Sequence, residues 1–208
     1  MVAAEMQNPV KERILDHART RFFDEGIARV SVDEITSELG MSKKTFYKCF
    51  ERKEDLVREI VSRMLGEIGL KIQGIVSMDA PFPAKIDALV RVVGMIFKTI
   101  SKHMLRDLQV YVPDAWAHIQ TFRRERILTT WAALIEEGKT TGYIRPEINQ
   151  RVFVLSFFAA VENVVNPTVL SNEQFSCDDA IESIITIFLT GILTDQATQT
   201  FHGLHHTS

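Results

Sequence analysis

The sequence SVDEITSELGMSKKTFYKCF, residues 31–50, contains the signals of two short helices separated by a tight turn. Ser31 and Glu34 form a capping-box pattern, in which each side chain bonds the backbone of the other. Gly40 ends the first helix, and Ser42 caps the second. The apolar positions of the first helix are Val32, Ile35 and Leu39. Two such helices and a glycine-containing turn predict a helix-turn-helix unit.

The second helix of this unit has two chemically different faces. Lys44 and Lys48 are four residues apart and share one face, because a helix repeats every 3.6 residues. Phe46 and Phe50 share the opposite face, and Tyr47 lies at the edge between them. The helix can therefore dock on a core through its phenylalanines while it presents lysines and a phenol outward.

Charge is concentrated at the same place. The whole chain has 24 Lys and Arg against 27 Asp and Glu, a net charge of -3, which does not indicate a general polyanion binder. Residues 42–53 instead contain five cations and one anion. Lysines in such a patch neutralise phosphates and release counterions. The alternative is an ordinary solvated face, and charge and periodicity do not separate the two.

Residues 14–26 and 32–56 closely resemble the N-terminal signature of the TetR family of bacterial regulators. The matching positions are Ile35, Gly40, Ser42, Thr45, Tyr47, Phe50, Lys53 and Leu56. The resemblance is strong from about residue 9 to 65. It implies that Ser42, Lys43, Lys44, Thr45, Tyr47 and Lys48 face DNA. It also implies that Lys53 contacts a phosphate at the start of the next helix.

Two positions depart from the family pattern. Cys49 stands where the family often has a histidine that holds the DNA backbone, and a thiol is a weak donor. We expect that contact to be lost or replaced, with a redox role for Cys49 as the alternative to an idle thiol. Arg52 stands where the family has a small polar cap. Arginine cannot cap a helix as serine does, although it can add a phosphate contact.

The remaining sequence is helical in pattern throughout, so we expect an all-α fold of about nine helices. The later helices are expected near 84–100, 102–111, 114–139, 150–165 and 178–193, with 167–176 as a connection. With the resemblance, this predicts a helix-turn-helix DNA-binding domain over 8–68 with its motif at 31–50. A helical effector-binding and dimerisation domain follows over 69–195, and 196–208 form a tail.

The last two expected helices are more apolar than the core of one subunit requires. Their apolar positions are Phe153, Phe157, Phe158, Val161, Ile181, Ile184, Ile185, Phe188 and Ile192. The resemblance implies a homodimer in which these helices form a four-helix interface. A two-fold dimer suits a palindromic double-stranded DNA operator. The alternative is that these residues fill the core of one chain.

The resemblance also implies a pocket for a small-molecule effector between the middle helices. Candidate lining residues are Met95, Phe97, Met104, Leu108, Tyr111, Trp116, Phe122 and Trp131, with ordinary core packing as the alternative. Glu162, Asn163 and Asn166 interrupt an apolar helix, and buried polar groups need partners. They are ligand contacts, interface hydrogen bonds or solvent-facing positions. A mainly apolar pocket predicts a lipophilic effector.

Several function classes lack support. The sequence has no nucleophile–base pairing, metal-ligand spacing or glycine-rich phosphate loop, so we expect no enzyme activity, cofactor or metal. No apolar run approaches the roughly twenty residues of a membrane span. Two distant cysteines, Cys49 and Cys177, suit the reducing cytoplasm. The expected function is a cytoplasmic DNA-binding transcriptional regulator, a repressor that an effector releases. The alternative is a helical module that acts through protein partners.

Overall fold

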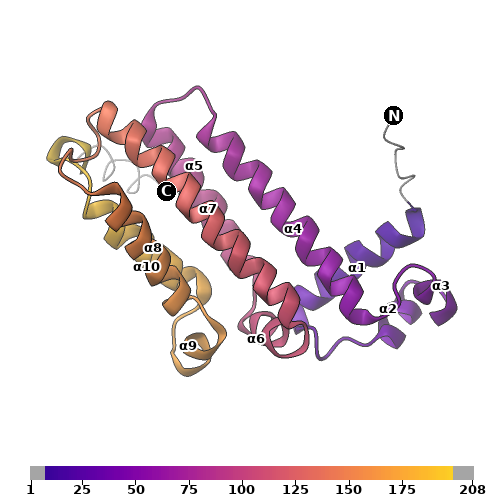
Figure 1. Ribbon diagram of the computed structural model, residues 1–208. Coiled ribbons are helices and arrows are strands. Elements are labelled where there is room, and N and C mark those ends of the chain that lie inside the picture. The colour runs from indigo at the N-terminus through magenta and orange to yellow at the C-terminus, as the bar shows by residue number, and fades with distance from the viewer. Residues whose placement is uncertain (1–7, 199–208) are drawn as a thin grey trace. The chain divides into compact units, whose positions relative to one another are not determined.

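The computed structural model describes residues 8–198, and its regular structure is helical (Figure 1). The ten helices of this part of the chain are α1 (Pro9–Glu25), α2 (Val32–Glu38), α3 (Lys43–Tyr47), α4 (Lys53–Val76), α5 (Phe82–Thr99), α6 (Lys102–Tyr111), α7 (Pro113–Thr140), α8 (Gln150–Val164), α9 (Pro167–Asn172) and α10 (Cys177–Thr190). The only extended pairing over residues 8–198 is an isolated antiparallel bridge between Ile144 and Leu193. The all-α prediction is confirmed.

The helix missing from the sequence-based prediction is α9, in the segment expected as a connection. Asn166 caps it by accepting a hydrogen bond from the Val169 amide at 3.1 Å, and Pro167 occupies its first turn. Asparagine followed by proline is a helix-start signal, because proline has no amide hydrogen to leave unsatisfied there. Asn166 therefore has a local structural role.

The chain divides into two compact units. The first contains described residues up to 65 together with 99–119, and the second contains 66–98 with 120–198. Helix α6 thus packs with the N-terminal helices, whereas the sequence-based division at 68 groups it with the C-terminal region. Its buried side chains Met104, Leu105 and Leu108 are at most 2% exposed. The expected tail lies outside the described residues from 199 onward.

Local signals start and end the helices of the first unit. Asn8 caps α1, and the α1 side chains Ile14, Leu15, Ala18 and Phe22 form its buried face. Gly26 ends α1 with φ of 91°. The capping box of Ser31 and Glu34 is present at α2, as predicted. These caps set where the helix-turn-helix begins.

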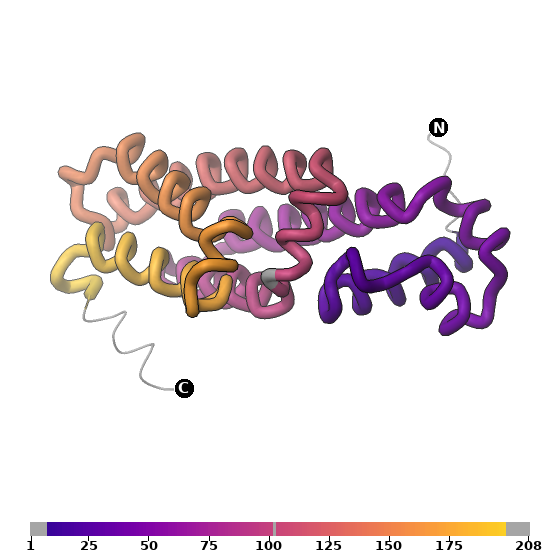
Figure 2. The backbone as a smooth tube through the Cα atoms, turned by 90° about the horizontal axis from the view of Figure 1, so that it is seen from below, coloured from indigo at the N-terminus to yellow at the C-terminus, as the bar shows by residue number. Residues whose placement is uncertain are grey.

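The second unit is built around an aromatic cluster. Trp131 of α7 lies 4.8 Å from Phe157 of α8, and Phe157 lies 5.3 Å from Phe188 of α10, measured between ring centroids. Helices α8 and α10 lie side by side (Figure 2). Lys85 of α5, which is 8% exposed, pairs with Glu137 of α7 at 2.9 Å. No helix of residues 8–198 is both long and apolar enough to cross a membrane.

Candidate nucleic-acid interface

The turn between α2 and α3 is closed by backbone hydrogen bonds. The Met41 amide donates to the Thr36 carbonyl at 2.9 Å, and the Gly40 amide donates to the Ser37 carbonyl at 3.1 Å. Gly40 has φ of 63°, which glycine adopts without steric cost. Arg13 of α1 donates to the Leu39 carbonyl at 3.2 Å. The turn therefore fixes the direction in which α3 leaves α2.

Ser42 caps α3, as the sequence predicts. Its hydroxyl accepts a hydrogen bond from the Thr45 amide at 3.1 Å and lies 2.9 Å from the Thr45 hydroxyl. Ser42 is exposed and Thr45 is half-buried. This cap gives the Thr45 amide, one of the unpaired amides of the first turn of α3, a partner.

Helix α3 is anchored by its own Phe46 and by Phe50, which follows three residues after the helix ends. Phe46 is 0% and Phe50 is 4% exposed, and their ring centroids are 5.7 Å apart. Tyr47 packs edge-on against Phe46 yet remains 52% exposed. Lys44 and Lys48 are exposed on the other side of the helix. The division of α3 into an anchor and an outward face agrees with the sequence pattern, while contact with DNA remains a prediction.

The lysines of this face differ in their partners. Lys43 pairs with Asp33 of α2 at 2.7 Å, and the Asp33 carboxylate raises the pKa of Lys43. Lys44 and Lys48 make no ion pair with any residue in 8–198. Their charges are therefore fully available to an external anion, whereas the charge of Lys43 is shared with an acidic neighbour that the sequence analysis did not single out.

Lys53 does not share this exposed face. Its ammonium is half-buried, donates to the Ile27 carbonyl and lies 5.7 Å from the Phe22 ring centroid. Burial lowers the pKa of Lys53. The structure thus gives Lys53 a backbone partner within its own unit, and its contact with a DNA phosphate stays a prediction.

The two departures from the family pattern have local partners. The Asn8 side-chain amide donates weakly to the Cys49 sulfur at 3.9 Å, so the half-buried thiol faces the start of α1. At α4, the Asp55 carboxylate accepts a hydrogen bond from the Arg52 amide at 3.0 Å. Asp55 thereby gives the Arg52 amide an acceptor, which is the reciprocal half of a capping box, and its place three residues after Arg52 is the sequence signal for this contact.

The predicted effector-lining residues differ in burial and are divided between the two units. Met104, Leu108 and Trp131 are buried, and Phe97, Trp116 and Phe122 are half-buried. Met95 is 62% and Tyr111 is 56% exposed. The first unit contains Met104, Leu108, Tyr111 and Trp116, and the second unit contains the others. The predicted lining set therefore stays a prediction.

Glu162 and Asn163 are exposed to solvent on α8. The Asn163 amide donates to the Ala159 carbonyl one turn earlier at 2.7 Å, which is a local bond within the helix. Exposure in the single chain agrees with the solvent-facing alternative and with the interface alternative, and it does not favour a ligand contact inside one subunit. The assignment of Glu162 and Asn163 to an effector pocket stays a prediction that their exposure does not favour.

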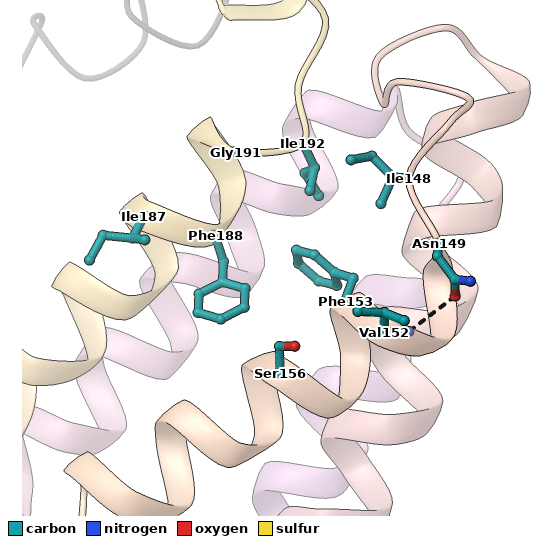
Figure 3. Close-up of a pocket in the computed structure, with 9 residues that line it drawn as sticks. All are labelled: Ile148, Asn149, Val152, Phe153, Ser156, Ile187, Phe188, Gly191 and Ile192. Carbon is teal, nitrogen blue, oxygen red and sulfur yellow. Dashed lines mark hydrogen bonds between the residues drawn. The ribbon is translucent and has the colours of Figure 1, made fainter.

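Each unit of the described chain contains a cavity. A groove of about 370 Å³ lies between α8 and α10 (Figure 3) and is lined by Ile148, Asn149, Val152, Phe153, Ser156, Ile187, Phe188, Gly191 and Ile192. A smaller cavity of about 220 Å³ in the first unit is lined by Ile27, Ala28, Lys53, Glu54, Val57, Tyr111 and Val112. Over residues 8–198, no three His, Cys, Asp or Glu side chains are grouped to hold a metal.

Most of the apolar residues assigned to a dimer interface lie inside the second unit instead. Seven of the nine are buried, namely Phe153, Phe157, Val161, Ile181, Ile184, Ile185 and Ile192. Phe158 and Phe188 are half-buried. The apolar side chains that α8 and α10 expose are Val152 at 59%, Leu155 at 42% and Ile187 at 67%. The sequence pattern does not indicate that these three side chains are exposed, because both faces of each helix are apolar.

Known proteins resemble the chain over the helix-turn-helix and beyond. Residues 14–60 match the sequence profile of the bacterial regulatory proteins of the tetR family. The HTH-type transcriptional regulator YvaF of Bacillus subtilis (strain 168) is 26% identical over 175 residues, which cover 80% of this chain and 87% of YvaF.

Solved structures of similar fold cover nearly the whole chain. The fatty acid degradation regulator FadR from Bacillus halodurans is 19% identical, with a TM-score of 0.65 over 90% of this chain and 98% of that one. FadR from Bacillus subtilis in complex with stearoyl-CoA is 16% identical, with a TM-score of 0.59 over 87% of this chain and 98% of that one. At these identities the likeness establishes the fold.

Proposed function

Because the chain belongs to the TetR family of bacterial transcriptional regulators, we propose that it is a repressor that binds a palindromic operator as a homodimer. A small lipophilic effector would release it. The observation that carries the DNA-binding part is the outward face of α3. There Lys44, Tyr47 and Lys48 are exposed, the two lysines have no ion pair within residues 8–198, and buried Phe46 holds the helix in place.

In this proposal α3 enters the major groove. Lys44 and Lys48 neutralise phosphates or donate to guanine, and the Tyr47 hydroxyl bonds a phosphate oxygen. Ser42, Lys43 and Thr45 complete the surface at the start of α3. Lys43 would exchange Asp33 for a phosphate.

The homodimer is proposed through α8 and α10. Val152 and Ile187 leave apolar surface exposed at the groove between these helices, and Phe153 and Phe188 turn toward one another beneath it (Figure 3). A second copy related by a two-fold axis would cover the same surface on both subunits. Two copies of α3 would then read two half-sites.

A lipophilic effector is supported by the apolar character of the second unit. Bacillus subtilis FadR, of similar fold, is complexed with stearoyl-CoA. We propose that an effector binds against the half-buried aromatics Phe97 and Phe122 of the effector-binding domain. Release follows if the effector binds more tightly to a conformation that fits the operator poorly.

The test is selection of genomic DNA fragments by the purified protein, followed by binding of the recovered fragment to variants. We expect Lys48→Ala and Tyr47→Ala to lose at least about tenfold in affinity while the oligomeric state stays unchanged. Lys71→Ala removes an exposed lysine of α4 and is the matched control, with unchanged binding. Wild-type affinity in both α3 variants would refute the reading face. If the protein retarded no DNA, action through a protein partner would be favoured.

A further inference from the structure

A single peptide group in the loop between α1 and α2 is held from two sides. The carbonyl of Ile27 accepts a hydrogen bond from the Lys53 ammonium at the start of α4. The amide of Ala28, which belongs to the same peptide group, donates to the Asp107 carboxylate of α6 at 2.7 Å. Hydrogen bonds to charged groups are stronger than those between neutral groups, and this peptide makes two of them, one with a cation and one with an anion.

The surroundings of Lys53 direct its ammonium toward this peptide. The side chain is half-buried against the Phe22 ring, and no carboxylate within residues 8–198 forms an ion pair with it. The carboxylates of Glu54, Glu34 and Asp107 act on it only through their longer-range charge. The Ile27 carbonyl is therefore the hydrogen-bond partner that compensates the buried ammonium.

The approach of Asp107 depends on the residue before the clamped peptide. A Cβ atom at Gly26 would lie 2.9 Å from the Asp107 Oδ2 atom and 3.4 Å from the His103 Cβ atom. Gly26 also has φ of 91°, which residues with a side chain rarely adopt. Glycine at this position thus lets α6 reach the Ala28 amide.

Apolar packing does not fill the space beside this peptide. The cavity of about 220 Å³ in the first unit is lined by Ile27, Ala28 and Lys53, and by Tyr111 of α6. The loop is held by these two polar contacts together with the buried side chains of Ile27 and Val30. Ser31, three residues beyond Ala28, is the cap at which α2 begins.

We propose that Lys53 and Asp107 are positioning residues that together clamp the Ile27–Ala28 peptide and thereby set the direction of α2 and α3 for operator reading. This inference rests on the proposed DNA-binding function. It differs from the family-based expectation, because Lys53 acts on the protein backbone and not on a DNA phosphate.

The two roles of Lys53 predict different salt dependences of operator binding. Loss of one phosphate contact lowers the slope of log affinity against log salt concentration by about one. Because the proposed homodimer carries two copies of Lys48, we expect Lys48→Met to lower this slope by about two. For Lys53→Met we expect about tenfold or more weaker binding at every salt concentration, with the wild-type slope. A slope lowered by about two in Lys53→Met would overturn the proposal.

A control separates positioning from general loss of stability. Arg63→Met removes another α4 side chain that bonds α1, through Glu12 at 3.0 Å, but it leaves the clamped peptide untouched. We expect its operator affinity to stay within about twofold of wild type, since it lies outside the clamp. If Arg63→Met and Lys53→Met are folded to the same extent and weaken operator binding equally, the clamp has no specific role.

Amide hydrogen exchange tests the clamp without DNA. We expect Asp107→Ala and Lys53→Met each to speed exchange in residues 27–39, while 150–164 stay unchanged. Asp107→Asn keeps an acceptor and should restore part of the protection. We expect exchange in the double variant to be only slightly faster than in the faster of the two single variants, because loss of either contact is enough to open the clamp. Exchange at the wild-type rate in both single variants would overturn the clamp. If the variants speed exchange as expected but the protein binds no DNA, the proposed function is overturned and the clamp is not.

Discussion

At the scale of single residues, backbone conformation and close contact can make one glycine irreplaceable while another is dispensable. Gly26 combines φ of 91° with an Asp107 oxygen 2.9 Å from the position of a Cβ atom. Gly66 of α4 has ordinary helical backbone and nothing within 4 Å of that position. The two residues are chemically identical, so their surroundings alone decide the effect of adding a methyl group.

We predict that Gly26→Ala lowers the free energy of unfolding by about 1–3 kcal/mol, because alanine is strained at positive φ and displaces Asp107. Gly66→Ala is the control and should raise it by about 0.5–1 kcal/mol, since alanine favours the helix more than glycine does. Urea unfolding followed by circular dichroism measures both. Equal effects of the two substitutions would show that the Gly26 backbone is free to relax.

At the scale of elements, α2 is held by neighbours because seven residues form no stable helix alone. His17 lies 2.6 Å from the Glu38 carboxylate at the end of α2, and Arg21 bonds both Glu38 and Glu25. Arg21 and His17 lower the pKa of Glu38. Hydrogen bonds from Ser31 lower the pKa of Glu34 at the other end of α2. Both ends of α2 therefore depend on ionised carboxylates.

These shifts predict loss of stability in acid. A carboxyl whose pKa is lower in the folded state stabilises the fold above its unfolded pKa of about 4.3 and loses that contribution as pH falls through the folded value. We expect the melting temperature to change little from about pH 7 to 5 through these groups and to drop below about pH 4. Glu38→Gln should melt lower than wild type at neutral pH, with the gap closing in acid. If the difference in melting temperature between wild type and Glu38→Gln stays the same across this pH range, the charge of Glu38 does not have the proposed role.

At the scale of the whole chain, local signals were predictable and long-range burial was not. Ser31 and Ser42 were identified as caps because a cap depends on residues three positions away. The backbone partner of Lys53 was not predictable, because Ile27 lies 26 residues earlier in the chain. The exposed Ile187 was overlooked because an apolar helix gives no sign of which face a subunit leaves uncovered.

The apolar side chains that α8 and α10 expose bear on how the protein assembles. Ile187 is 67% exposed on α10, and Leu70 is 72% exposed on α4. Neither should be needed for the fold of one chain. If α8 and α10 pair with a second copy, a glutamate at position 187 would be buried there without a partner, which is costly.

We therefore expect Ile187→Glu to weaken dimerisation by at least about a hundredfold while circular dichroism and melting of the monomer remain near wild type. Leu70→Glu is the matched control and should remain dimeric. Sedimentation equilibrium over a concentration series measures both. Ile187→Glu should also weaken operator binding, because two half-sites are then read by separate subunits. A dimer of wild-type affinity in Ile187→Glu would place the interface on another surface of the chain.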